Sequence, residues 1–273
     1  MVRTSDDDEA RVTLLQASAG ERTVPGVWRE NYWFRRHEVA YGLACGVAAA
    51  LLAGLDAGDR APIALDAGCG EGYGAARLAR VLDPTRAGVP RRAGAVGRVL
   101  ALDYDGAAVR HLAFRYPEVT GLRGNLVGMP LADDTADLVV SLQTIEHLWN
   151  PRAFVRECAR VLRPGGHVLL STPNRLTFPP GNVFHHRELD AEELLDLMGS
   201  AFGQIDVSGV HHGRRLRSWE ARHGSIVDAQ IRSEPDRWPP SLAEMVRSIT
   251  AADFEIRPDV ADSRDLIAQA IAP

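Results

Sequence analysis

The sequence contains few cysteines, and their number is odd. Cys45, Cys69 and Cys158 are the three cysteines in 273 residues, and no two of them form a C-x-x-C pair. A disulfide framework needs an even set and a structural zinc site usually needs closely spaced pairs, so neither is indicated. Free thiols suit a reducing compartment, and we therefore expect a cytoplasmic protein.

Excess positive charge and long apolar runs are also missing. Lys and Arg number 31 against 36 Asp and Glu, a net charge of -5, so we expect no nucleic-acid partner. The longest apolar run, Val47 to Leu52, falls far short of the roughly 18 residues of a membrane span. The chain opens on Asp6-Asp7-Asp8-Glu9 instead of the basic region of a secretory signal, so no membrane partner is expected.

Apolar periodicity predicts an α/β fold in which strands and helices alternate. A helix over Glu30–Ala53 precedes the first strand. Strand patterns occupy Pro62–Ala67, Arg98–Asp103, Thr120–Asn125, Ala136–Ser141 and His167–Thr172, and helical patterns occupy Tyr73–Leu82, Gly106–Arg115 and Pro151–Leu162. This alternation is typical of a parallel, doubly wound, Rossmann-like sheet.

The pattern loosens after Pro173, where the sequence predicts a helix near 190–198 and strands near 204–210 and 265–271. The predicted sheet then has seven strands. We expect residues 1–20 to form a disordered arm, because they are polar and lack periodicity. Residues 21–273 form one predicted domain, with a cofactor-binding core over 61–174 and a segment at 210–248 inserted over the substrate site.

A glycine cluster follows the first predicted strand, in Leu65-Asp66-Ala67-Gly68-Cys69-Gly70-Glu71-Gly72. Such a turn lets a cofactor lie against backbone that no side chain shields. Residues 70–75 also satisfy the dinucleotide pattern G-x-G-x-x-G/A, so NAD and S-adenosylmethionine (SAM) both stay open. Asp66 is placed to receive the ammonium group of SAM, or to cap a helix, and Asp103 ends a strand where a carboxylate can accept both ribose hydroxyls.

Two further motifs carry a family resemblance. Gln143-Thr144-Ile145-Glu146-His147-Leu148 follows the fourth strand, and Leu162-Arg163-Pro164-Gly165-Gly166 precedes the fifth. Over residues 61–174 the sequence resembles the class I SAM-dependent methyltransferases of the UbiG-like kind, which implies SAM as cofactor and S-adenosylhomocysteine as product. The cofactor-binding residues implied are Asp66, Gly68, Gly70, Gly72, Tyr73, Asp103, Tyr104, Asn125, Leu126 and Gln143. Tyr104 and Leu126 fit simple packing roles equally well.

His147 is the predicted catalytic base. An alkyl hydroxyl is too weak an acid to ionise first, and a neutral imidazole of pKa about 6.5 suits the removal of its proton as the new bond forms. Glu146 would orient this histidine. The alternatives are a helix-capping or loop-binding role for His147 and a first-turn helix position for Glu146.

No metal site is expected. His185-His186 and His211-His212 are adjacent pairs, and adjacent residues on a strand point to opposite faces. No H-E-x-x-H accompanies them. We predict instead that a substrate cleft is lined by Trp33, Arg36, His185, Arg187 and His212.

The flanking segments narrow the resemblance. They include Gly20-Glu21-Arg22-Thr23-Val24-Pro25, residues 30–37, 154–160, 171–175 and 221–230. From Gly20 onward the chain resembles actinobacterial glucose O-methyltransferases associated with methylglucose lipopolysaccharide assembly, with the mycofactocin oligosaccharide methyltransferase as a possible relative. Asp66 departs from this group, in which glutamate is expected. The loop over 83–97 is longer than in the group, and the segment over 180–185 is shorter.

The resemblance implies an oligosaccharide acceptor, methylated on the 6-hydroxyl of α-1,4-linked glucose units, and a homodimer is compatible with it. Three other functions stay open from the residues themselves. They are methylation of a quinone or phenol, hydride transfer with NAD, and SAM binding without catalysis.

Overall fold

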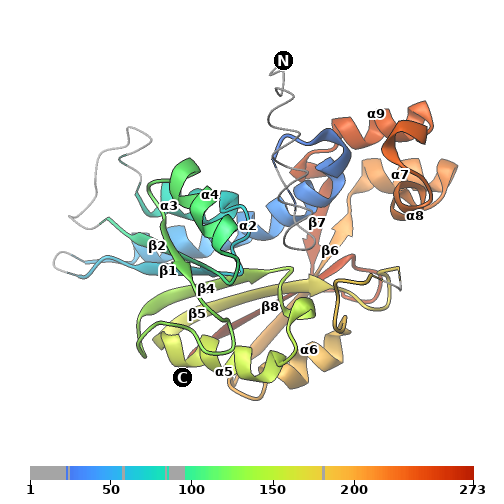
Figure 1. Cartoon of the computed structure of the whole chain (residues 1–273). Coiled ribbons are helices and arrows are strands. Elements are labelled where there is room, and N and C mark those ends of the chain that lie inside the picture. Colours follow the sequence, from blue (N-terminus) through green and yellow to red (C-terminus); the bar gives the residue numbers. More distant parts are fainter. Residues whose placement is uncertain (1–22, 24, 57–58, 84, 86–95, 180–181) are drawn as a thin grey trace.

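The structure is a computed structural model, and it describes residues 23, 25–56, 59–83, 85, 96–179 and 182–273. The predicted arm over 1–20 and most of the loop over 83–97 lie outside the described residues. The described chain forms one sheet with helices on both faces, as Figure 1 shows.

The sheet has eight strands in the order β3-β2-β1-β4-β5-β8-β6-β7. β3, β2, β1, β4 and β5 run parallel, whereas β8 is antiparallel to both of its neighbours and β7 is antiparallel to β6. The predicted α/β Rossmann-like fold is confirmed, but the sheet is mixed and has one strand more than the seven predicted. The strands are Ile63–Ala67, Arg98–Asp103, Thr120–Arg123, Ala136–Leu142, Leu162–Pro173, Ile205–His212, Phe254–Arg257 and Asp265–Ile271, numbered β1 to β8.

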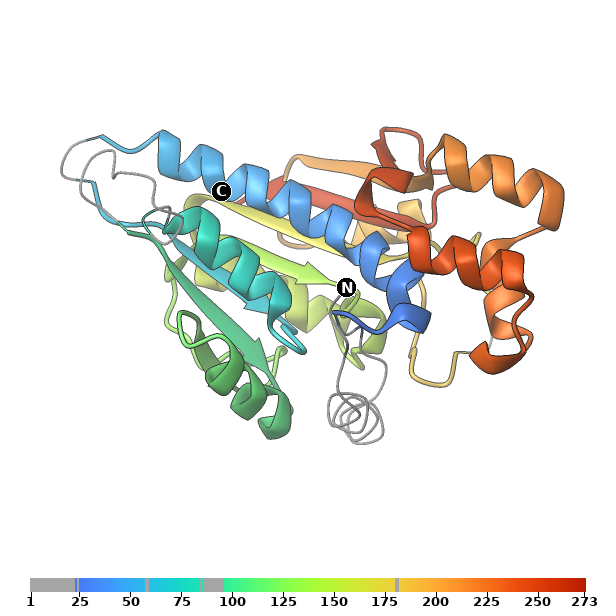
Figure 2. The same cartoon turned by 90° about the horizontal axis from the view of Figure 1, so that it is seen from above.

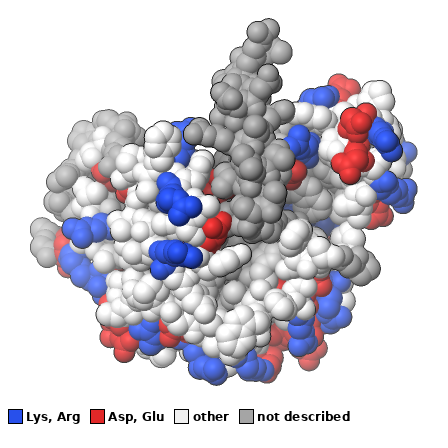
Figure 3. Space-filling view, in the orientation of Figure 1, with Lys and Arg blue, Asp and Glu red and all other residues white. Residues whose placement is uncertain are grey.

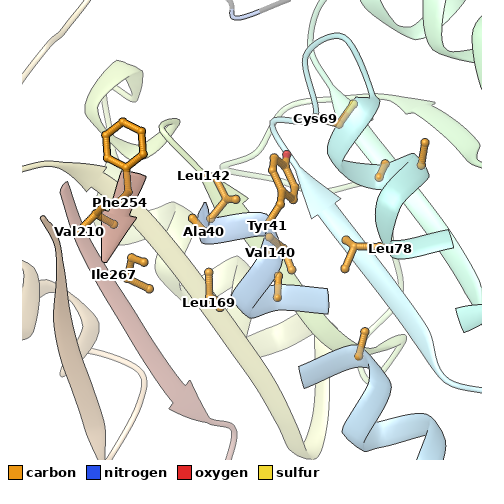
Figure 4. Close-up of a cluster of buried hydrophobic side chains, with 14 of the residues drawn as sticks. Ala40, Tyr41, Cys69, Leu78, Val140, Leu142, Leu169, Val210, Phe254 and Ile267 are labelled. Carbon is orange, nitrogen blue, oxygen red and sulfur yellow. The ribbon is translucent and has the colours of Figure 1, made fainter. Parts of the chain in front are cut away.

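The helices form two layers. α2 (Asn31–Ala53), α3 (Tyr73–Leu82) and α4 (Gly106–Arg115) lie on one face of the sheet, and α5 (Pro151–Val161) and α6 (Ala191–Met198) lie on the other, as Figure 1 shows. Each layer buries its own apolar cluster. In Figure 4, Tyr41 of α2 and Leu78 of α3 lie over Val140 and Leu169 of the sheet. Burial of these side chains is the main force that holds the helices on the strands.

Side chains at the helix starts explain where three of these helices begin. The Asp105 carboxylate accepts a hydrogen bond from the Ala107 amide at the start of α4, and the Asn150 side chain accepts one from Ala153 at the start of α5. Asp190 and Glu193 form a reciprocal capping box on α6. Each contact satisfies backbone N–H groups that lack a partner in the first turn.

α2 and α3 are in close contact near the glycine turn that follows β1. Gly74 lies so near Tyr41 that a Cβ atom on it would be 1.9 Å from the Tyr41 ring carbon Cζ. The lack of a side chain at this position therefore lets the two helices meet. Figure 2 shows α2 running along the sheet beside α3.

The segment over 210–248 is helical after β6. It forms α7 (Arg214–His223), α8 (Ile226–Ile231), the short helix η4 (Pro235–Arg237) and α9 (Pro240–Ser248), and η5 (Ala251–Asp253) follows. The Asn31 side chain donates hydrogen bonds to the carbonyls of Val246 (2.7 Å) and Ile249 (2.9 Å), which ties this segment to the start of α2. These helices lie beyond β6 and β7 in Figure 1, beside the first turns of α2.

The surface agrees with the balanced composition. Acidic and basic side chains are interspersed on the face shown in Figure 3, so no single charge sign dominates it. No helix among the described residues is both long and apolar enough to cross a membrane.

Candidate active site

The glycine turn joins β1 to α3 and is fixed to the neighbouring strand. The amides of Gly68 and Cys69 donate to the Leu102 carbonyl at 2.8 and 3.1 Å. Gly70 has a φ of +50°, and a Cβ built on it would meet no atom within 4 Å. The backbone of the turn therefore borders open space, as a cofactor lying against it requires.

A cavity of about 540 Å³ opens against this turn. Its size is that of an ordinary small-molecule site. It brings together most of the predicted cofactor residues and the predicted base, namely Gly68, Gly70, Tyr73, Asp103, Tyr104, Asn125, Leu126, Gln143 and His147.

Asp66 and Gly72 were predicted to touch the cofactor, and the structure places both outside the cavity lining. Asp66 is fully buried, and its carboxylate accepts hydrogen bonds from the Tyr41 hydroxyl at 3.2 and 3.3 Å. Burial raises the pKa of Asp66 to about 7. Tyr41 itself lines the cavity, so Asp66 positions a lining residue instead of lining the site. Gly72, with a φ of +81°, is the N-cap of α3.

Asp103 is oriented by the backbone on either side of it. One carboxylate oxygen accepts from the Gly70 amide at 3.0 Å, and the other accepts from the Asp105 amide at 2.9 Å. A carboxylate has about four acceptor sites, so it keeps acceptor capacity for ribose hydroxyls.

Replacing Asp103 with Asn should weaken S-adenosylhomocysteine binding about tenfold, because a charged acceptor becomes a neutral one and one of its two oxygens becomes a donor. Calorimetric titration of the two proteins measures this. The matched control is Asp206→Asn, at an exposed residue of β6. If the Asp103 variant and the wild type bind S-adenosylhomocysteine equally well, Asp103 does not contact the cofactor.

The end of β4 leads into the predicted catalytic motif. Gln143 has a φ of +51°, which is uncommon for a residue with a side chain, and η3 (Ile145–His147) follows at once. Gln143 and His147 line the cavity of about 540 Å³, called the cofactor cavity below after its predicted ligand. They also line a smaller cavity of about 40 Å³, called the inner cavity below. Because Thr23 and His37 are shared as well, the two cavities adjoin.

Glu146 and His147 are close to a third residue, His185. Glu146 is only 1% exposed, accepts a hydrogen bond from the Thr172 hydroxyl (3.1 Å), and has its pKa raised by burial to about 8. The ring centroids of His147 and His185 lie 4.9 Å apart. These three residues offer ligand atoms within 4.8 Å of one another, a grouping that the reasoning on adjacent histidine pairs did not consider.

The predicted substrate residues do not form one cleft. The inner cavity is lined by Trp33, Arg36 and His185, and its volume of about 40 Å³ is too small for a sugar ring. Arg36 is buried there, with Nε 2.8 Å from the Asp265 carboxylate.

Arg187 and His212, also predicted to line the substrate cleft, lie outside both cavities. Arg187 is exposed and forms an ion pair with Glu193 of α6, outside both cavities. His212 is buried between the Tyr32 hydroxyl (2.8 Å) and the Glu220 carboxylate (2.8 Å), a packing role in the second half of the sheet. Sequence alone could not tell which face each side chain would occupy.

Several lining residues were missed by the sequence reasoning. Trp149 (69% exposed), Phe184 (52% exposed) and His186 lie on the cofactor cavity, and Tyr41 and His37 approach it from α2. They come from loops and from one helix, with no common spacing that could have revealed them. The inserted segment over 210–248 contributes none of the described residues that line these two cavities.

Comparison with known proteins gives consistent matches. Residues 65–170 match the family described as a methyltransferase domain. The chain is 47% identical over 269 residues to a probable S-adenosylmethionine-dependent methyltransferase of Mycobacterium tuberculosis H37Rv, covering 93% of this chain and 89% of that protein. It is 26% identical over 206 residues to the 27-O-demethylrifamycin SV methyltransferase of Amycolatopsis mediterranei, covering 74% and 70%.

A solved structure shares the fold. It is that of a SAM-dependent methyltransferase from Thermotoga maritima, described as a possible histamine N-methyltransferase, with a TM-score of 0.54 and 17% identity. The match covers 89% of this chain and 93% of that one.

Proposed function

Because this chain belongs to the family of S-adenosylmethionine-dependent methyltransferases, we propose that it methylates a hydroxyl group of a glucose-containing oligosaccharide. The proposed position is the 6-hydroxyl of α-1,4-linked units, as in methylglucose lipopolysaccharide assembly. The observation that carries the proposal is that His147 lies on both the cofactor cavity and the inner cavity that holds Glu146.

Family membership also decides the cofactor. The cofactor is SAM, so the NAD alternative is wrong. We propose that the glycine turn binds it. The residues fit the group, since the open backbone at Gly70 and the oriented Asp103 carboxylate offer a cradle and an acceptor for ribose. When bound, SAM supplies an electrophilic methyl group on a positive sulfur.

The chemistry of the acceptor follows from the base beside the cavity. An alcohol becomes a good nucleophile only as it loses its proton, so a neutral imidazole at the reaction centre favours a hydroxyl acceptor. The His147 Nδ1 lies 2.9 Å from the Phe184 carbonyl, which can only accept; Nδ1 therefore carries the proton and Nε2 the lone pair. As the carbon–oxygen bond forms and the carbon–sulfur bond breaks, His147 takes the hydroxyl proton, leaving a methyl ether and S-adenosylhomocysteine.

The outer rim of the cofactor cavity supports a sugar acceptor. Trp149 and Phe184 expose their rings there, and His186 lies beside them. Aromatic faces supply apolar surface for the C–H groups of a pyranose ring, and a histidine can hydrogen-bond its hydroxyls. A phenol would also stack on these rings, so phenolic acceptors belong in the test.

To test the proposal, purified protein is incubated with SAM and one of two acceptor panels. The first panel holds α-1,4-linked gluco-oligosaccharides, and the second holds small phenols. The expected result is an oligosaccharide that gains the mass of one methylene group, and linkage analysis should place the methyl group on oxygen 6. Omission of SAM and heat-inactivated protein are the controls.

Each other result has a definite meaning. Methylation of the phenols alone would replace the sugar proposal by the quinone or phenol alternative. Methylation of the sugar at another oxygen would overturn the position and keep the substrate class. Tight S-adenosylhomocysteine binding with no methylated product in either panel would contradict the proposed function and favour a non-catalytic role.

A further inference from the structure

We propose that Glu146, His147 and His185 form a binding site for a divalent transition-metal ion beside the cofactor cavity. Each of the three offers one ligand atom, and these atoms lie within 4.8 Å of one another. All three residues line the inner cavity of about 40 Å³. That volume admits an ion with one or two waters.

The tautomer of His147 suits a metal ligand. Its Nδ1–H donates to the Phe184 carbonyl at 2.9 Å, which leaves the lone pair on Nε2. Metal-binding histidines in proteins commonly have this arrangement, with the second ring nitrogen held by a carbonyl or a carboxylate.

His185 has the same kind of support. Its side chain is 4% exposed, and its Nδ1 lies 2.8 Å from the Glu188 carboxylate. Since a carboxylate accepts, Nδ1 carries the proton and Nε2 the lone pair, which accepts a hydrogen bond from the Asn182 amide at 3.1 Å. An ion would take the place of that amide. A carboxylate behind an imidazole makes it a stronger ligand.

Glu146 supplies the negative charge. Its side chain is buried and accepts a hydrogen bond from the neutral Thr172 hydroxyl. Arg36 lines the same cavity, and its guanidinium is already paired with Asp265 at 2.8 Å. As a ligand, Glu146 would be a buried carboxylate, and a divalent cation would compensate its charge.

The backbone holds the two halves of the group together. The His186 and Arg187 amides donate to the Glu146 carbonyl at 2.8 and 3.3 Å. These hydrogen bonds hold the loop that carries His185 against η3, which carries Glu146 and His147. A contraction on the order of 1 Å would bring the ligand atoms to the spacing of a tetrahedral ion.

The donor set selects the class of ion. Two imidazoles and a carboxylate are typical of zinc and related transition metals, whereas Mg²⁺ and Ca²⁺ prefer all-oxygen sites. A cation held there would supply a Lewis acid that lowers the pKa of a coordinated hydroxyl. His147 would then hold the ion, and the hydroxyl proton would pass to water in the cofactor cavity. This deepens the function proposed above and rests on it for the identity of the acceptor.

The test is a titration of metal ions into the full chain, with no acceptor present. Protein treated with EDTA and returned to metal-free buffer is titrated with ZnCl₂ and then, separately, with MnCl₂ and MgCl₂, by calorimetry with metal counted by mass spectrometry. We expect one Zn²⁺ per chain, weaker Mn²⁺ and no Mg²⁺ at that site. Glu188→Gln, which keeps all three ligands, should weaken Zn²⁺ binding about 10- to 100-fold.

Two further variants make the outcome decisive. His147→Ala combined with His185→Ala should abolish this binding, whereas His223→Ala, which changes an exposed histidine outside both cavities, should not. Zn²⁺ binding that survives the double change, or none in the wild type, overturns the proposal. Loss of methylation after EDTA and its return with Zn²⁺ would support it. Since binding is read without acceptor, a metal-binding protein that methylates no sugar would refute the proposed function and leave the metal site standing.

Discussion

Replacing His147 with Ala is expected to lower kcat for a hydroxyl acceptor by about 10²- to 10⁴-fold, the usual contribution of a positioned proton acceptor. S-adenosylhomocysteine affinity should stay nearly unchanged, because the predicted cofactor cradle consists mainly of the glycine turn and Asp103. The expectation holds whether His147 takes the proton itself or holds a cation that acidifies the hydroxyl. Initial rates and calorimetric affinity, measured on the same preparation, test it.

His223→Ala is the matched control, since this histidine is exposed on α7 and stacks on Trp219 away from both cavities. It should retain wild-type rates. Unchanged turnover of the His147 variant would exclude His147 from the chemistry. Equal losses of turnover and cofactor affinity would instead identify it as a cofactor contact, the loop-binding alternative that the sequence left open.

Much of the fold could be predicted because its signals are local. The helix at Tyr73–Leu82 and the strands at Arg98–Asp103 and Asp265–Ile271 have the predicted bounds, since apolar periodicity runs up to glycine, proline or acidic residues at their ends. β7 (Phe254–Arg257) was missed because it is only four residues long and lies outside the regular alternation of strands and helices. The equally short β3 could be predicted because it follows α4 within that alternation. The antiparallel course of β8 could not be predicted, because strand direction depends on a connection through α7 to α9.

The candidate site also has one part that local sequence signals predict and one part that they do not. The predicted cofactor residues follow strand ends, and parallel strands end at one edge of a sheet. Gly70, Asp103 and Gln143 could therefore be placed on one cavity from the sequence. The substrate residues depend on which way loops and side chains turn. His147 and His185 lie close together because backbone hydrogen bonds hold the loop of His185 against η3. The His212 side chain is directed toward the Tyr32 hydroxyl.

Asp66 should make the stability of the protein fall as pH rises. Its pKa is about 7 in the folded protein, raised mainly by burial, against about 3.9 in an unfolded chain. Between these values the unfolded state has released the proton that the folded state keeps, so the free energy of unfolding decreases with pH. Above pH 7 both states are ionised and the loss ends, at roughly 4 kcal/mol for this one group.

Asp66→Asn removes that titration and keeps an oxygen that can accept from the Tyr41 hydroxyl. Urea unfolding at pH 5 and pH 8 should show that the stability of the variant relative to wild type improves by roughly 3 kcal/mol over this range, whatever its stability at pH 5. Asp206→Asn, at an exposed site on β6, should follow the wild-type pH dependence. If wild type and Asp66→Asn lose stability in parallel, the buried carboxylate is already ionised at pH 5, and Asp66 then holds Tyr41 at the cavity as an anion instead of as a neutral acid.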